Sequence, residues 1–180
     1  MRKLNFIAGL DTSISESDFM ISTCTICNTY KEKCLSLHQQ LIPKTMYNRE
    51  YTPERISELK ENEIFVFGSN LAGMHGGGAA WIAYERFGAI MGQGVGLQGQ
   101  SYAIPTMQGG VETIKPYVDE FIEFAHQHQE YKFLVTKIGC GIAGFRNEEI
   151  APLFENAIDL ENVILPKEFV DWIQSHPTAE

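Results

Sequence analysis

The sequence contains no continuous apolar run of 18 residues or more, which is the length that a membrane-spanning helix requires. Its first ten residues, MRKLNFIAGL, are too short and too weakly apolar to act as a signal peptide. From these two absences we expect a cytoplasmic protein that has no membrane partner.

Basic residues are scarce, since 14 Lys and Arg stand against 23 Asp and Glu and the net charge is -9. A chain of this charge repels a polyanion, so a long nucleic acid is not an expected partner. A small anionic ligand is still compatible with the charge, because backbone N–H groups and helix N-termini bind phosphate without any lysine.

Cysteine is also scarce, and four cysteines in 180 residues do not make a disulfide framework. Three of them and one histidine follow the spacing C-x2-C-x6-C-x3-H, and these side chains have the chemistry of tetrahedral zinc ligands. The residues are Cys24, Cys27, Cys34 and His38. The alternative is that they are ordinary thiols and a surface histidine in a polar segment. We therefore predict no cofactor and keep zinc as the alternative.

Polarity divides the chain in two. Residues 1–50 are polar and rich in Ser and Thr, so we interpret them as an N-terminal extension that adds a strand to a sheet or packs on its edge. Residues 51–180 carry the signals of one ligand-binding domain. Thr52 as N-cap and Pro53 as first helical residue predict a short helix that ends at Lys60.

From residue 63 onward, strand and helix patterns alternate. The predicted strands are residues 63–68, 100–106, 131–138 and 162–166, and the predicted helices are 76–88, 113–128, 148–158 and 168–176. The strand segments IFVF and FLV are apolar without a period of two, as expected for strands that are covered by helices on both faces. The pattern therefore predicts an α/β fold, arranged as a three-layer α/β/α sandwich.

Three glycine-rich stretches compete as the ligand site. GMHGGGAA, residues 73–80, has the outline of a phosphate loop, but Ala79 and Ala80 stand where Lys and Ser or Thr are required. GVGLQG, residues 94–99, lacks a helix after it and is interpreted as a flexible connection. GCGIAG, residues 139–144, has a strand before it and a helix after it, as in a Rossmann dinucleotide site, with Glu168 as the acid sought for the ribose.

A Rossmann half needs further strands after its glycine turn, and too few residues follow, so the Rossmann interpretation stays an alternative. Two glycine turns remain as candidate ligand loops, residues 68–78 and 139–147, and each connects a strand to the helix that follows it. If the two strands are neighbours, both helix N-termini point into one crevice and can bind a diphosphate.

The chain resembles the macro domains, a family that binds ADP-ribose, over roughly residues 60–175. Two segments carry the resemblance, VFGSNLAGMHGGGAAWIAYERFG and VTKIGCGIAGFRNEEIAPLF. It implies a mixed, mostly parallel central sheet and an ADP-ribose-like ligand held between the two glycine loops. It assigns ligand binding to Asn70, Gly76, Gly77, Gly78, Gly139, Cys140, Gly141, Ile142, Ala143, Gly144 and Phe145.

The resemblance leaves catalysis open. Ala80 stands where hydrolytic macro domains often carry an acid. His75 is the candidate general base for hydrolysis of an ADP-ribosyl bond, although it could equally hydrogen-bond loop backbone. Cys140, near a helix N-terminus, could be a nucleophile or a small buried filler. Hydrolysis and binding without turnover are therefore both kept as hypotheses.

Overall fold

The structure is a computed structural model that describes residues 49–177. The chain divides into two units, Met1–Arg49 and Glu50–Glu180, and every element below belongs to the second. The expectation of an N-terminal extension over residues 1–50 and the zinc alternative at Cys24, Cys27, Cys34 and His38 lie outside the described residues.

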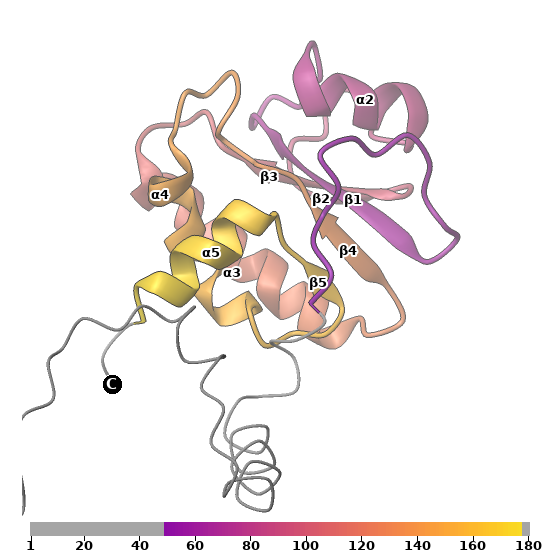
Figure 1. Ribbon diagram of the computed structural model, residues 1–180. Helices are drawn as coiled ribbons and strands as arrows, with labels where there is room; N and C mark the ends of the chain where they lie inside the picture. Colours follow the sequence, from indigo (N-terminus) through magenta and orange to yellow (C-terminus); the bar gives the residue numbers. More distant parts are fainter. Residues whose placement is uncertain (1–48, 178–180) are drawn as a thin grey trace, which may run out of the picture. The chain divides into compact units, whose positions relative to one another are not determined.

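A five-stranded sheet with the order β2-β3-β1-β4-β5 forms the centre of this unit (Figure 1). The strands are β1 (Glu63–Ser69), β2 (Gly96–Gln98), β3 (Ser101–Pro105), β4 (Lys132–Val135) and β5 (Val163–Ile164). The pairs β1–β3, β1–β4 and β4–β5 are parallel, and only the edge pair β2–β3 is antiparallel. The predicted α/β class with a mixed, mostly parallel sheet is therefore confirmed.

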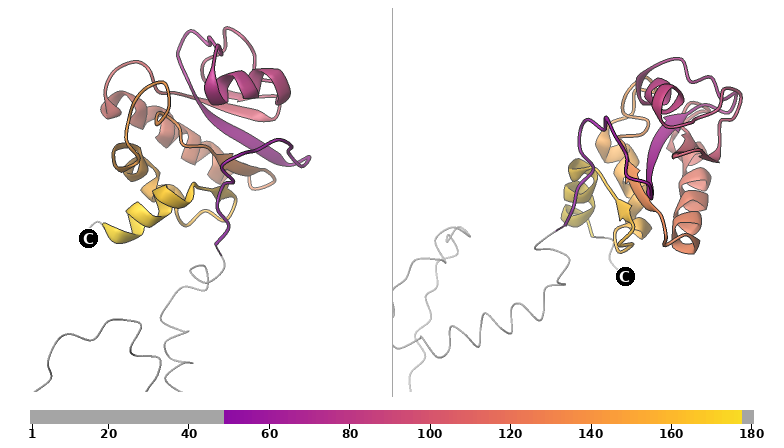
Figure 2. Two further views of the ribbon diagram at one scale, coloured as in Figure 1. Left: turned by 45° about the horizontal axis from the view of Figure 1, so that its top comes forward. Right: turned by 90° about the vertical axis from the view of Figure 1, so that its right-hand side faces the viewer.

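Helices follow the strands, as the alternating pattern predicted. They are α2 (Gly78–Arg86), α3 (Val111–Gln127), α4 (Asn147–Ile150), the 3-10 helix η3 (Ala151–Ala157) and α5 (Lys167–Ser175). In both views of Figure 2, α2 lies beside β1 and is separate from α3 and α5.

Two apolar clusters meet on β1, because successive side chains of a strand point to opposite faces. Ile64 and Val66 belong to the larger cluster, to which α3, η3 and α5 contribute. Phe65 and Phe67 belong to the smaller one, to which α2 contributes Ala80 and Ala83. Helices thus contact both faces of the central strand, while a three-layer arrangement of the whole domain stays a prediction.

The predicted helix over residues 53–60 is wrong, since no helix forms there. Thr52 does not cap a helix; its hydroxyl donates to the carbonyl of Ile164 at 2.7 Å and its N–H donates to the carbonyl of Leu165 at 3.0 Å. These long-range bonds tie the segment to the end of β5. Ile56 and Leu59 then pack against the smaller apolar cluster without helical structure.

Two further predictions need correction. Residues 94–99, interpreted as a flexible connection, contain strand β2, which the glycine-rich composition of the segment hid.

The single helix expected over residues 148–158 is instead α4 followed by η3, with Pro152 at the start of the 3-10 segment. Proline has no N–H to donate, so it interrupts the regular α-helical ladder there.

Candidate functional site

A hollow of about 170 Å³ lies at the carboxyl ends of β1, β3 and β4. Its wall combines the end of β1 and the start of α2 with the connection that leaves β4, and both glycine stretches lie at this end of the sheet (Figures 1 and 2). Of the residues that the sequence assigned to ligand binding, seven line it: Asn70, Gly77, Gly78, Gly139, Gly141, Ile142 and Ala143. The two glycine loops are therefore brought together, as the motif order predicted.

The start of α2 is an uncapped helix N-terminus on the wall of the hollow. Its N-cap, Gly77, is extended, and no side chain caps the first turn. Because the first N–H groups of a helix have no intrahelical partner, this end carries partial positive charge. Ile142 leans across it, since a Cβ added at Gly77 would lie 3.3 Å from the Ile142 Cδ1 atom. Glycine at position 77 therefore leaves room for the Ile142 side chain next to the start of α2.

The second wall is the loop that follows β4. Gly139 has φ +72°, and a Cβ there would lie 3.2 Å from the Phe145 ring and 3.3 Å from Ile150. The N–H of Gly144 donates to the carbonyl of Gly141 at 3.0 Å, which closes a tight turn. The side chain at the tip, Ile142, is 73% exposed. Glycine is thus required at position 139 both for its conformation and for packing.

The expectation that two helix N-termini converge is wrong for the second helix. α4 has only four residues, and none of them lines the hollow. The second wall consists of loop residues 139–143 instead. One helix beginning and one loop, not two helix beginnings, face each other across the hollow.

Asn70 shapes the first loop with both ends of its amide. Its Nδ2 donates to the Met74 carbonyl at 2.9 Å, and its Oδ1 accepts from the Met74 N–H at 3.0 Å. The loop also lies directly against residues 92–94, because a Cβ at Gly94 would come within 2.1 Å of the Asn70 carbonyl oxygen. The side chain that the family resemblance assigns to ligand binding therefore makes two hydrogen bonds within the loop.

His75 is fully buried and does not line the hollow, so the structure does not support it as a general base. Its Nε2 lies 3.1 Å from the carbonyl oxygens of Ile90 and Gln93, which fixes the proton on Nε2 because both partners are acceptors. The ring also packs edge-on against Phe67 at 5.2 Å. The geometry corresponds to the alternative role, a histidine that anchors the glycine loop.

Cys140 is not an activated nucleophile. Burial raises the pKa of its thiol to about 11, and the nearby carboxylates of Glu149, Glu148 and Glu168 add to this rise against the opposing effect of Lys137. The side chain packs against the larger apolar cluster and does not line the hollow. The geometry corresponds to the alternative of a small buried filler, and the nearby helix α4 is one short turn that carries Glu148 and Glu149.

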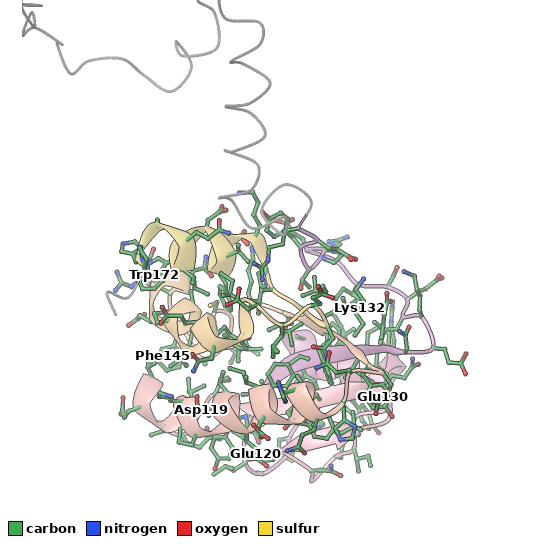
Figure 3. All side chains as sticks on the ribbon, turned by 90° about the horizontal axis from the view of Figure 1, so that it is seen from below. Asp119, Glu120, Glu130, Lys132, Phe145 and Trp172 are labelled. Atoms are coloured by element: carbon green, nitrogen blue, oxygen red, sulfur yellow. The ribbon has the colours of Figure 1, made fainter. Side chains whose placement is uncertain are left out.

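Three other residues assigned to ligand binding do not line the hollow. Phe145 packs against the larger apolar cluster, to which α3 contributes (Figure 3). Gly76 and Gly144 are exposed beside the two loops. A Cβ added at either would meet nothing within 4 Å.

The polar side chains of the hollow are mostly ones that sequence patterns did not single out. Ser69 donates to the Gly94 carbonyl, Thr136 donates to the Val66 carbonyl at 2.8 Å, and Thr106 donates to the Ser69 carbonyl at 3.4 Å. Each stands at or just after the carboxyl end of a strand. That position is the sequence signal that could have identified these residues as part of the site.

Lys137 also lines the hollow, and its ammonium group lies 2.5 Å from the carboxylate of Glu168 at the start of α5. Hydrogen bonding to Glu168 raises the pKa of Lys137, and the same contact lowers the pKa of Glu168. Glu168, the acid sought for a Rossmann ribose, therefore pairs with a lysine and does not line the hollow.

Within residues 49–177, no group of three or more His, Cys, Asp and Glu side chains is placed to hold a metal ion. None of the helices described there is long and apolar enough to cross a membrane. Comparison of the chain with protein-family models, with curated proteins and with solved structures found no match.

The anchoring role of His75 predicts a large effect on stability. Replacing it by Ala leaves a cavity and removes the hydrogen bonds from Nε2 to the carbonyls of Ile90 and Gln93, so we expect the free energy of unfolding to fall by about 2–3 kcal/mol. Urea denaturation measures this loss. The exposed His126→Ala variant is the control and should change stability by less than about 0.5 kcal/mol. Equal midpoints for the two variants would contradict the anchoring role.

The raised pKa of Cys140 predicts a slow thiol. With the pKa moved from 9.0 to about 11, the thiolate at pH 8 is roughly 100-fold less abundant than in an ordinary cysteine. We expect iodoacetamide to alkylate Cys140 far more slowly in the native protein than in urea. Mass spectrometry of the peptide that contains Cys140 follows this rate separately from the other cysteines. Similar rates in both conditions would show an accessible thiol whose pKa is not raised, and would contradict this prediction.

Proposed function

We propose that this chain binds ADP-ribose, or a related nucleotide diphosphate, in the hollow between its two glycine loops. The observation that carries the proposal is that two stretches about 60 residues apart in the sequence, residues 77–80 and 139–143, line one hollow at the carboxyl edge of a parallel sheet. Ligands of open α/β sheets bind at this edge.

The chemistry of the wall favours an anion. The uncapped first turn of α2 presents N–H groups, and the glycines on both sides let phosphate oxygens approach the backbone closely. The net charge of -9 does not oppose this, since a small anion in the hollow is stabilised by local dipoles. A diphosphate is a ligand that two facing backbone walls would hold from both sides.

The resemblance to macro domains indicates the class of ligand, which is ADP-ribose or a similar compound. It requires the GGG segment and the GCGIAG segment to meet around one ligand, and their meeting in one hollow supports it. The Rossmann alternative has less support, because Glu168 pairs with Lys137 and does not line the hollow.

Binding without turnover is the form of the function that the site supports. Among the described residues, no Asp, Glu, His or Cys lines the hollow. His75 and Cys140, the two candidates for acid–base or nucleophilic chemistry, lie outside it. A general base must come within hydrogen-bond reach of the proton it removes, and these side chains do not meet that condition.

A pair of glycine variants tests the binding proposal. Gly141 lines the hollow and Gly76 does not, yet a Cβ at either position meets nothing within 4 Å. We expect Gly141→Ala to narrow the hollow and weaken ADP-ribose binding about tenfold in calorimetric titration, with little change in stability. Gly76→Ala should bind like the unmodified chain. Loss of affinity in both variants, or in neither, would argue against binding in this hollow.

Turnover is tested separately. A protein carrying an ADP-ribosyl group is incubated with the chain, and released ADP-ribose is followed by chromatography. We expect binding of ADP-ribose with no release above the rate without protein. Steady release that persists over many turnovers would replace the binding role with a hydrolytic one.

A further inference from the structure

Lys137 is the only charged residue that lines the hollow within the part of the chain that the structure describes. It lies between Val135, where β4 ends, and the glycine loop that begins at Gly139, so it belongs to the second wall of the hollow. The other residues of the lining are glycine, apolar or polar without charge. A diphosphate carries a negative charge on each phosphate group, and Lys137 is the residue of this lining that can offset part of that charge.

The ammonium group of Lys137 keeps donors that the protein does not use. An ammonium has three N–H groups, and the structure shows one hydrogen bond from it, to the carboxylate of Glu168 at 2.5 Å. This hydrogen bond raises the pKa of Lys137, and the charges of Glu168 and Glu54 add to the rise. Lys137 is therefore a cation at neutral pH, with N–H groups left for a second acceptor.

The ion pair between Lys137 and Glu168 is half-exposed. The two side chains are 38% and 42% exposed, and water and salt screen a pair of this kind, so it contributes little to stability. Glu168 stands at the start of α5 and does not line the hollow, yet its carboxylate neutralises the lysine that does. An anion in the hollow and the carboxylate of Glu168 are thus two acceptors for one cation.

From these observations we propose that Lys137 binds a phosphate group of the ligand and that Glu168 competes with the ligand for this lysine. The inference rests on the proposed function and adds a specificity-determining side chain to it. In the free protein the carboxylate of Glu168 offsets the charge of Lys137. In the complex the ammonium group donates to a phosphate oxygen, so that ligands with a diphosphate are selected by a charge as well as by backbone N–H groups.

Calorimetric titration of the full chain with ADP-ribose tests this with variants of opposite expected effect. Lys137→Met removes the charge and should weaken binding about tenfold. Glu168→Gln removes the competing charge at nearly constant size and should tighten binding about threefold. Lys137→Arg keeps the charge and should bind within about threefold of the unmodified chain. If the pair only held α5 against the loop, both Lys137→Met and Glu168→Gln would weaken binding.

A second ion pair in α5 supplies the matched control. Lys167 pairs with Asp171, and neither residue lines the hollow. Lys167→Met and Asp171→Asn change the net charge of the chain by the same amounts as Lys137→Met and Glu168→Gln. We expect both control variants to bind ADP-ribose like the unmodified chain. Equal effects of the test and control variants would show a response to net charge alone and overturn the inference.

The remaining outcomes separate the inference from the proposed function. If the unmodified chain binds ADP-ribose but Lys137→Met binds it equally well, Lys137→Arg binds as weakly as Lys137→Met, or Glu168→Gln does not tighten binding, the inference is overturned and the proposed function stands. If the unmodified chain does not bind ADP-ribose, the proposed function fails together with the inference.

Discussion

The parallel pairing of β1 with both β3 and β4 is the constraint on which the site depends. Val66 lies opposite Tyr102 on one side and Val135 on the other, so the three strands run in step and end together. Everything that follows these ends therefore meets at one edge: the first loop after β1, Thr106 after β3 and the glycine turn after β4. The side chains of β1 that alternate between two apolar clusters hold this arrangement in the core.

The hollow is a backbone site whose side chains serve mainly to fix the backbone. His75 anchors the first loop to the carbonyls of Ile90 and Gln93, and Asn70 closes the loop on Met74. Gly139 allows the second loop to pack on Phe145 and Ile150. The imidazole of His75 and the thiol of Cys140 do not line the hollow.

Sequence patterns predicted the elements whose signal is local and strong. β1, β3, β4 and α3 follow from apolar runs and from helical spacing such as Ile114, Val118, Phe121 and Ala125, all of them buried. The sequence-based predictions fail where contacts between residues distant in the sequence determine the local structure. Thr52 bonds to β5 rather than capping a helix, and β2 owes its existence to pairing with β3. Glycine spacing predicted which loops meet, but it carried no information on where His75 and Cys140 point, because that depends on segments distant in sequence.

The proposed binding site requires the first turn of α2 and the loop 139–143 to contact the same anion. Backbone amide resonances recorded during titration with ADP-ribose test it most directly, since each N–H reports its own environment. We predict saturable shifts of Ala79, Ala80, Gly141 and Ile142 with one common dissociation constant. Shifts confined to one of the two segments, or shifts that centre on another part of the domain, would show that the two segments do not bind one anion.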